Sequence, residues 1–118
     1  MRYLLLIYTN ETADQNASAA DQAAVMEAYN TYSRDLGASG SLIAGEALQP
    51  TSTATTVRIR DGKTATTDGP FAETKEQLGG YYLINAKDLN EAIQWAIKLP
   101  AAKWGSVEVR PIWEFPPQ

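Results

Sequence analysis

The spacing of apolar and polar residues changes several times along the chain, and each change predicts a new structural element. Residues 3–9 form a nearly continuous apolar run, which is typical of a strand buried on both faces. The small polar residues 10–17 then predict a loop. Helical spacing follows over residues 21–36, where one apolar stripe collects Val25, Ala28, Tyr29, Tyr32 and Leu36. Either Ser18 or Asp21 can cap the start of this helix.

The rest of the chain predicts further strands and one more helix. We expect strands over residues 42–48, 53–60, 63–67, 81–85 and 106–113, and a helix over residues 88–99. In the strand over residues 53–60, Val57 and Ile59 alternate with arginines, which predicts one buried face. Asp61-Gly62 is a typical hairpin turn. The apolar face of the second helix consists of Leu89, Ala92, Ile93, Ala96 and Ile97.

This order of elements predicts a single α+β domain over residues 1–118. Its plan is ferredoxin-like βαββαβ with an extra β-hairpin, so that both helices cover one face of a mainly antiparallel sheet. The other face then carries a large apolar patch, which we assign to Leu4, Leu6, Tyr8, Tyr81, Leu83 and Ile112. A second copy that packs sheet against sheet would cover this patch, which predicts a homodimer.

Composition excludes several classes of chemistry. The chain has no cysteine, which excludes disulfides and thiolate nucleophiles, and no histidine, which excludes Ser-His-acid triads and the commonest metal ligand. We therefore expect no metal and no cofactor. A net charge of −4 without any basic run argues against a nucleic-acid partner. The apolar start is far too short to span a membrane and lacks the pattern of a secretory signal, so we expect a cytoplasmic location and no membrane partner.

Residues 66–81 read TTDGPFAETKEQLGGY, and this run resembles the signature of the DGPF-type proteins of the YCII-related family. The segments over residues 1–8, 44–50, 54–58 and 105–111 also resemble that family, so the similarity covers essentially the whole chain. It implies a dimeric α+β barrel of two ferredoxin-like subunits, in agreement with the bare sheet face. It also implies a bacterial protein that is often encoded beside an extracytoplasmic-function sigma factor.

Three residues are candidates for catalysis. Relatives in the wider family carry a proposed catalytic His on the first helix, and the corresponding position here is Tyr29. A phenol with a reference pKa of about 10 cannot replace imidazole as a base near neutral pH without strong tuning. Asp68 begins a tight turn fixed by Pro70, either as a carboxylate at the rim of a pocket or as a local turn that bonds its own backbone. Glu46 is either a buried carboxylate with a raised pKa or an exposed edge residue.

Five residues are candidates for ligand binding, namely Arg58, Arg60, Pro70, Phe71 and Lys75. Arg58 and Arg60 share one strand face and can hold a carboxylate or phosphate, or pair with Glu108 or Glu114 on a neighbouring strand. Lys75 is the candidate amine nucleophile, which would require a depressed pKa. The charged segment around it either orders over a site or is a solvated turn.

Two functions follow from these residues. The first is a small-molecule-binding or regulatory module linked to an extracytoplasmic-function sigma factor, where the sigma-factor link comes from the family resemblance. The alternative is a cofactor-independent enzyme acting on a small organic substrate, with Tyr29, Glu46 and Asp68 in a pocket between the first helix and the sheet. Fold analogy permits the enzyme but does not by itself establish it.

Overall fold

The computed structural model describes residues 1–117, which form one four-stranded sheet, one separate hairpin and three α-helices. The elements in chain order are β1 (Arg2–Thr9), α1 (Glu11–Gln15), α2 (Ala19–Ala38), β2 (Leu42–Ala47), the 3₁₀ turn η1 (Thr51–Thr53), β3 (Thr55–Arg60), β4 (Lys63–Asp68), β5 (Gln77–Asn85), α3 (Leu89–Lys98), the 3₁₀ turn η2 (Pro100–Lys103) and β6 (Ser106–Pro111). The predicted α+β class with antiparallel pairing is confirmed.

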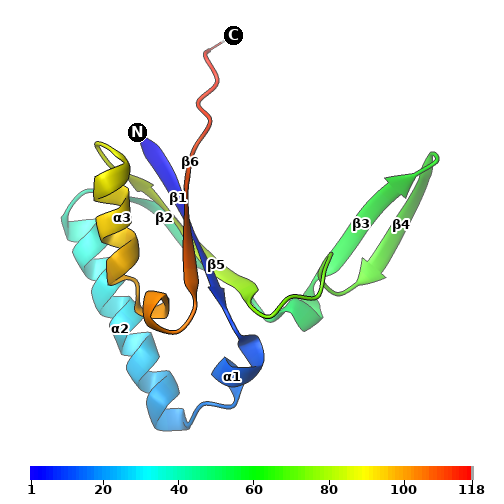
Figure 1. Ribbon diagram of the computed structural model, residues 1–118, viewed down its shortest axis with the longest axis horizontal. Coiled ribbons are helices and arrows are strands. Elements are labelled where there is room, and N and C mark those ends of the chain that lie inside the picture. Colours follow the sequence, from blue (N-terminus) through cyan, green and yellow to red (C-terminus); the bar gives the residue numbers. More distant parts are fainter. Residues whose placement is uncertain (118) are drawn as a thin grey trace.

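The main sheet has the strand order β2-β5-β1-β6, and all of its neighbouring strands are antiparallel. The long helices α2 and α3 lie together on one side of it, whereas the β3–β4 hairpin projects away from the body (Figure 1). The two hairpin strands pair with each other and form a separate two-stranded sheet. The chain therefore consists of a two-layer body and one extended arm.

The core lies between the sheet and the two long helices. Tyr3, Leu5 and Ile7 alternate along β1 and are all buried, and they face Leu36 of α2 among other core residues. Leu5, Leu36, Ile84 and Leu99 are fully buried, and each stabilises the fold by about 1.5–3 kcal/mol through removal of apolar surface from water.

The opposite face of β1 is less well covered. Leu4 and Leu6 are only half-buried, and so are their antiparallel neighbours Leu83 and Tyr81 on β5. We call this surface the open face of the sheet. The prediction that β1 is buried on both faces is therefore wrong for a single subunit, because α2 and α3 both pack on the other side.

Helix starts follow the sequence closely, with one exception. The Ser18 side chain accepts a hydrogen bond from the backbone N–H of Asp21 at 3.1 Å, which confirms Ser18 as the cap of α2. Residues predicted to be a loop contain α1, because the Asn10 side chain accepts a hydrogen bond from the Ala13 N–H at 2.9 Å and starts a helical turn. The loop prediction for that segment is wrong.

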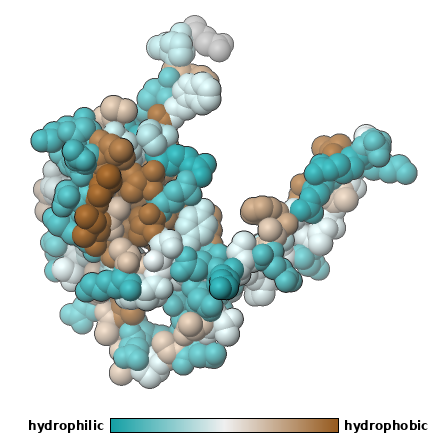
Figure 2. Space-filling view, in the orientation of Figure 1, coloured by the Kyte–Doolittle hydropathy of each residue, from teal (hydrophilic) through white to brown (hydrophobic). Residues whose placement is uncertain are grey.

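The apolar stripe of α3 is covered only in part. Ala92 and Ala96 are buried against the sheet, but Leu89, Ile93 and Ile97 are 48%, 36% and 61% exposed. Figure 2 shows the resulting gathering of apolar side chains over this helix. Of the five residues of the predicted apolar face, the two small alanines are the ones buried against the sheet.

The hairpin turn has the backbone that its sequence predicts. Asp61 and Gly62 have φ values of 52° and 74°, as a two-residue hairpin loop with left-handed backbone requires. Val57 and Ile59, however, are 60% and 64% exposed, because the arm stands clear of the body. The prediction of a buried face on β3 is therefore wrong within one subunit. The last strand also ends earlier than predicted, at Pro111.

Candidate functional site

The signature loop, which we define as residues 69–76 between β4 and β5, is tied to the base of the hairpin. The Gly69 N–H donates to the Ala54 carbonyl at 2.7 Å, and the Gly69 carbonyl accepts a bond from the Thr56 hydroxyl at 2.8 Å. Gly69 has a φ of 103°, a backbone conformation that favours glycine. Arg58 donates to the Phe71 carbonyl at 3.1 Å, so an arginine of the arm holds the loop from one side.

Glu11 connects the first turn of α1 to two distant segments. Its carboxylate accepts bonds from both the N–H and the hydroxyl of Thr51, each at 2.7 Å. Its own N–H donates to the side-chain oxygen of Gln77 at 2.9 Å, and the amide of Gln77 in turn donates to the Thr74 carbonyl. We call Glu11, Thr51 and Gln77 the loop clamp, because together they fix the signature loop against α1 and η1.

A cavity of about 430 Å³, the loop pocket, lies between these three segments. The signature loop contributes Pro70 and Glu73 to its lining, and α1 contributes Glu11 and Gln15. Its volume lies within the range of about 300–1,000 Å³ that is typical of small-molecule sites. The lining mixes carboxylates, hydroxyls and amides with proline and alanine, so it can offer several hydrogen bonds to one small polar molecule.

The three candidate catalytic residues lie in different places. Tyr29 is half-buried on α2, on the helix side of the sheet. Glu46 is exposed on β2 and lies opposite Tyr81, which belongs to the open face. Asp68 is exposed at the end of β4, next to the signature loop. The structure of residues 1–117 does not bring them together in one subunit, and none of them lines the loop pocket.

Burial raises the pKa of Tyr29 to about 12, with a smaller contribution from Tyr82. The pKa therefore moves away from neutrality, so the phenol stays protonated and is suited to donate a hydrogen bond. The nearby Tyr32 hydroxyl donates to the Trp95 carbonyl at 2.9 Å, and burial raises the pKa of Tyr32 as well. Tyr82 shares a 2.6 Å hydrogen bond with Ser33. Tyr32 and Tyr82 contact edge to face, with 5.2 Å between the ring centres, and both of their hydroxyls are hydrogen-bonded.

The candidate ligand-binding residues divide between the pocket and the arm. Pro70 lines the loop pocket, while Phe71 is 78% exposed and Lys75 is exposed at the surface. Arg60 donates to the carbonyl of Ile59 on its own strand. All five residues belong to, or directly adjoin, the arm and its loop.

The alternative that Arg58 and Arg60 pair with Glu108 or Glu114 is wrong. Glu114 forms an ion pair with Arg2 at 2.6 Å, and Glu108 pairs with Arg110 on its own strand. The hydrogen bond from Arg2 lowers the pKa of Glu114 below its ordinary value. Both carboxylates lie along the edge strand β6 and the segment after it, whereas the arm points away from that edge (Figure 1).

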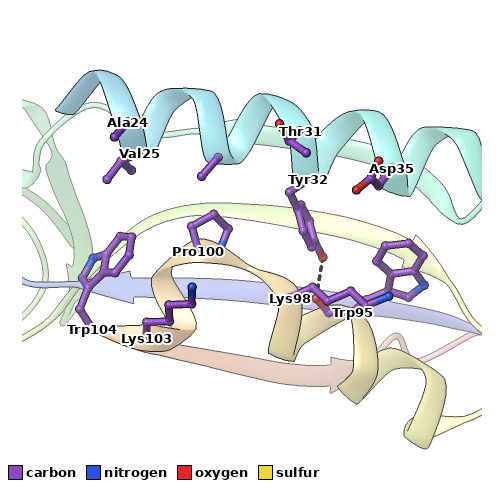
Figure 3. Close-up of a pocket in the computed structure, with 11 residues that line it drawn as sticks. Ala24, Val25, Thr31, Tyr32, Asp35, Trp95, Lys98, Pro100, Lys103 and Trp104 are labelled. Carbon is purple, nitrogen blue, oxygen red and sulfur yellow. Dashed lines mark hydrogen bonds between the residues drawn. The ribbon is translucent and has the colours of Figure 1, made fainter. Parts of the chain in front are cut away.

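Sequence reasoning missed the loop clamp and a second, larger cavity. The signal for the clamp was local, since Asn10 is a preferred helix cap and places Glu11 in the first turn that follows β1. The second cavity, the interhelical pocket, measures about 720 Å³ and lies between α2 and the α3–η2 segment (Figure 3). Within residues 1–117, no group of three acidic side chains is placed to hold a metal ion.

An antiparallel sheet with helices on one face, an open second face and an inserted hairpin define this chain as a two-layer α+β protein. The family model for the YCII-related domain matches residues 1–116, so the chain belongs to the YCII-related family. An uncharacterized protein of Rhizobium meliloti (strain 1021) is 40% identical over 119 residues, covering 99% of this chain and 96% of that protein. The family resemblance is confirmed. No helix found in residues 1–117 has the length and apolar character that crossing a membrane requires.

Proposed function

We propose that this chain is a DGPF-type, small-molecule-binding protein of the cytoplasm that works as a homodimer and takes its ligand in the loop pocket. The observation that carries the proposal is the loop clamp, because it fixes the signature loop over a cavity of ligand size. A site whose walls are held in place before binding loses less conformational entropy when the ligand arrives. The ligand class that fits the lining is a small polar molecule with several hydrogen-bond donors.

The dimer is the second part of the proposal. The strand order β2-β5-β1-β6, with α2 and α3 as crossovers on one face, fits a ferredoxin-like subunit into which the β3–β4 hairpin is inserted. Leu4, Leu6, Tyr81 and Leu83 leave a contiguous apolar surface on the open face. A second copy packed sheet to sheet removes this surface from water and produces a dimeric α+β barrel.

A regulatory role beside an extracytoplasmic-function sigma factor rests on the family resemblance. In this proposal the arm is the part of the chain that responds to the ligand, since Arg58 and Thr56 bond directly to the signature loop. Co-purification of the sigma factor encoded beside this protein, with and without the ligand, measures this link. Equal recovery under both conditions would remove the regulatory part and leave the binding part intact.

The enzyme alternative cannot direct all three candidate residues at one substrate. Tyr29 lies on the helix side and Glu46 on the open-face side of the same sheet, so one subunit cannot direct both at one substrate. Tyr29, with its raised pKa, would serve as a hydrogen-bond donor. A structure of the dimer in which the partner approaches Glu46 and Asp68 together would favour the enzyme.

A thermal-shift screen with polar metabolites tests the binding proposal. A ligand present at 100 times its dissociation constant adds about 2.7 kcal/mol to the free energy of unfolding. The matched variants are Ala72→Trp, which fills the loop pocket, and Ala65→Trp, which places the same side chain on an exposed position of the arm. We expect the first to abolish the shift and the second to keep it; equal shifts in both would place the ligand elsewhere.

A further inference from the structure

The interhelical pocket is separate from the loop pocket and is built by different elements. Its α2 wall consists largely of small side chains, including Ala24 and Ala28, which leave space in front of α3 and η2. Figure 3 shows Trp104 at one end of the pocket, Trp95 at the other and Pro100 between them. The volume of about 720 Å³ can hold a molecule with a flat apolar body between the two indoles.

The floor of this pocket is fixed by the protein core. Tyr32 is 5% exposed, and its hydroxyl donates to the Trp95 carbonyl at 2.9 Å, so the helix that carries one wall is bonded to the helix that carries the other. Tyr32 also contacts the Trp95 ring edge to face, with 6.1 Å between the ring centres. Pro100 is buried and limits the movement of η2. The pocket is therefore preformed.

The charged groups around this pocket are mainly positive, although the chain as a whole carries a net charge of −4. Lys98 stands over the Trp95 ring with 4.8 Å from its ammonium to the ring centre, and Asp35 is at the same end (Figure 3). Lys103 lies at the opposite end, beside Trp104. The two ion pairs within residues 1–117 use other residues, so both pocket lysines are unpaired there.

We propose that the interhelical pocket binds an aromatic organic anion, such as a naphthalene or benzoic acid derivative. The aromatic body lies against Trp104, and its carboxylate or sulfonate contacts the ammonium group of Lys103. Lys103 is the anion anchor because Asp35, the one acidic residue in the lining, lies at the other end beside Lys98. This proposal does not rest on the loop pocket or on the ligand proposed there.

Two fluorescent probes of nearly the same shape test the proposal. Anilinonaphthalene sulfonate carries an anionic group, and phenylnaphthylamine is its uncharged counterpart. The fluorescence of the bound probe measures the two affinities, and the variants described below locate the site. We expect the sulfonate to bind about five-fold more tightly than the neutral probe, which is the effect of one partly exposed ion pair, and we expect the difference to shrink at high salt.

Variants separate the pocket from other apolar surfaces of the chain. Lys103→Gln should remove the preference for the sulfonate and leave the neutral probe unchanged, while Lys87→Gln, an exposed lysine outside the pocket, should alter neither. Ala28→Trp fills the pocket at an exposed helix position and should abolish binding of both probes. Thr31→Trp, at a neighbouring exposed lining position, serves the same purpose if the first variant does not fold.

Three results would overturn the proposal. Equal affinity for the two probes would show that the pocket does not recognise the anionic group. An unchanged preference for the sulfonate in Lys103→Gln would show that a group other than Lys103 contacts it. Full binding by a folded, pocket-filled variant would place the probes on another apolar surface, such as the open face or the exposed stripe of α3.

Discussion

Glu11 accepts two hydrogen bonds from Thr51, which is 40 positions further along the chain, at 2.7 Å each. One bond comes from the backbone N–H and the other from the hydroxyl, so both carboxylate oxygens are used. The first helical turn after β1 is thereby bonded to the 3₁₀ turn that precedes the arm. These two segments are also the two walls of the loop pocket that the signature loop closes.

Replacing Glu11 should therefore weaken the fold as well as the pocket. We expect Glu11→Ala to lower the free energy of unfolding by about 1–3 kcal/mol, because it leaves the half-buried donors of Thr51 without an acceptor. Glu11→Gln keeps one acceptor oxygen and should cost less. Urea unfolding measures the change, and Glu73→Ala is the matched control at an exposed carboxylate. An equal loss in the control would contradict the role of the clamp.

The open face makes the oligomeric state sensitive to one substitution. Leu6 is half-buried and lies between Tyr81 and Glu108 on the two neighbouring strands. We expect Leu6→Glu to convert the proposed dimer into single subunits, because it removes an apolar side chain from the proposed interface and places an unpaired charge there beside Glu108. Light scattering at micromolar concentration measures the mass.

Met26→Glu is the control for this substitution, because Met26 is 63% exposed on α2, on the helix side of the sheet. It should leave the mass unchanged. A stable single subunit in the unmodified protein would refute the sheet-to-sheet dimer and the barrel with it.

The raised pKa of Tyr29 predicts how stability depends on pH. The phenol ionises near 10 in the unfolded chain and near 12 in the folded one, so only the unfolded state loses a proton between these values. This contribution to stability is complete below pH 10.0 and is lost as the pH rises toward about 12. Tyr29→Phe should flatten that part of the profile in chemical unfolding, although Tyr32 will still contribute. An identical profile in the variant would contradict the prediction.

Gly79 on β5 and Gly105, which precedes β6, should respond differently to the same change. A Cβ atom on Gly105 would lie 2.2 Å from the Tyr8 carbonyl oxygen, whereas a Cβ on Gly79 would meet nothing within 4 Å. We expect Gly105→Ala to destabilise the protein by about 1–3 kcal/mol, because the backbone of β1 must move. Gly79→Ala should be close to neutral. Thermal unfolding of the pair measures the difference, and similar values would show that the chain at residue 105 adapts freely.

Much of the fold could be predicted because its signals are local. The cap at Ser18 and the Asp61-Gly62 turn each depend on residues close in sequence, whereas the nearly continuous apolar run of β1 does not reveal which face the helices cover. Helix α1 was missed because five residues show too little periodicity to predict a helix. Its support comes from Gln77, on a strand that the sequence does not mark as its neighbour.

The candidate site was predicted less well because its contacts are distant in sequence. Asp68 ends β4 and does not line the loop pocket, whereas Pro70 does, and Gly69 between them has a left-handed backbone. The sequence does not reveal that this turn faces Glu11, because that contact depends on how the arm leaves the sheet. The exposure of Val57 was missed for the same reason, since alternation predicts two faces of a strand and not what lies against them.

Because β3 pairs only with β4, the arm and the body should differ in their stability against local unfolding. Backbone amides in the arm can exchange with deuterium through an opening that leaves the four-stranded sheet intact, whereas amides in β1 require disruption of the whole body. The bond from Gly69 to Ala54 closes the base of the arm, and the bond from Glu11 to Gln77 connects the end of the signature loop to the body. Occupation of the space beneath the loop would therefore slow exchange at the base of the arm first, and it would do so without any movement of the central strands.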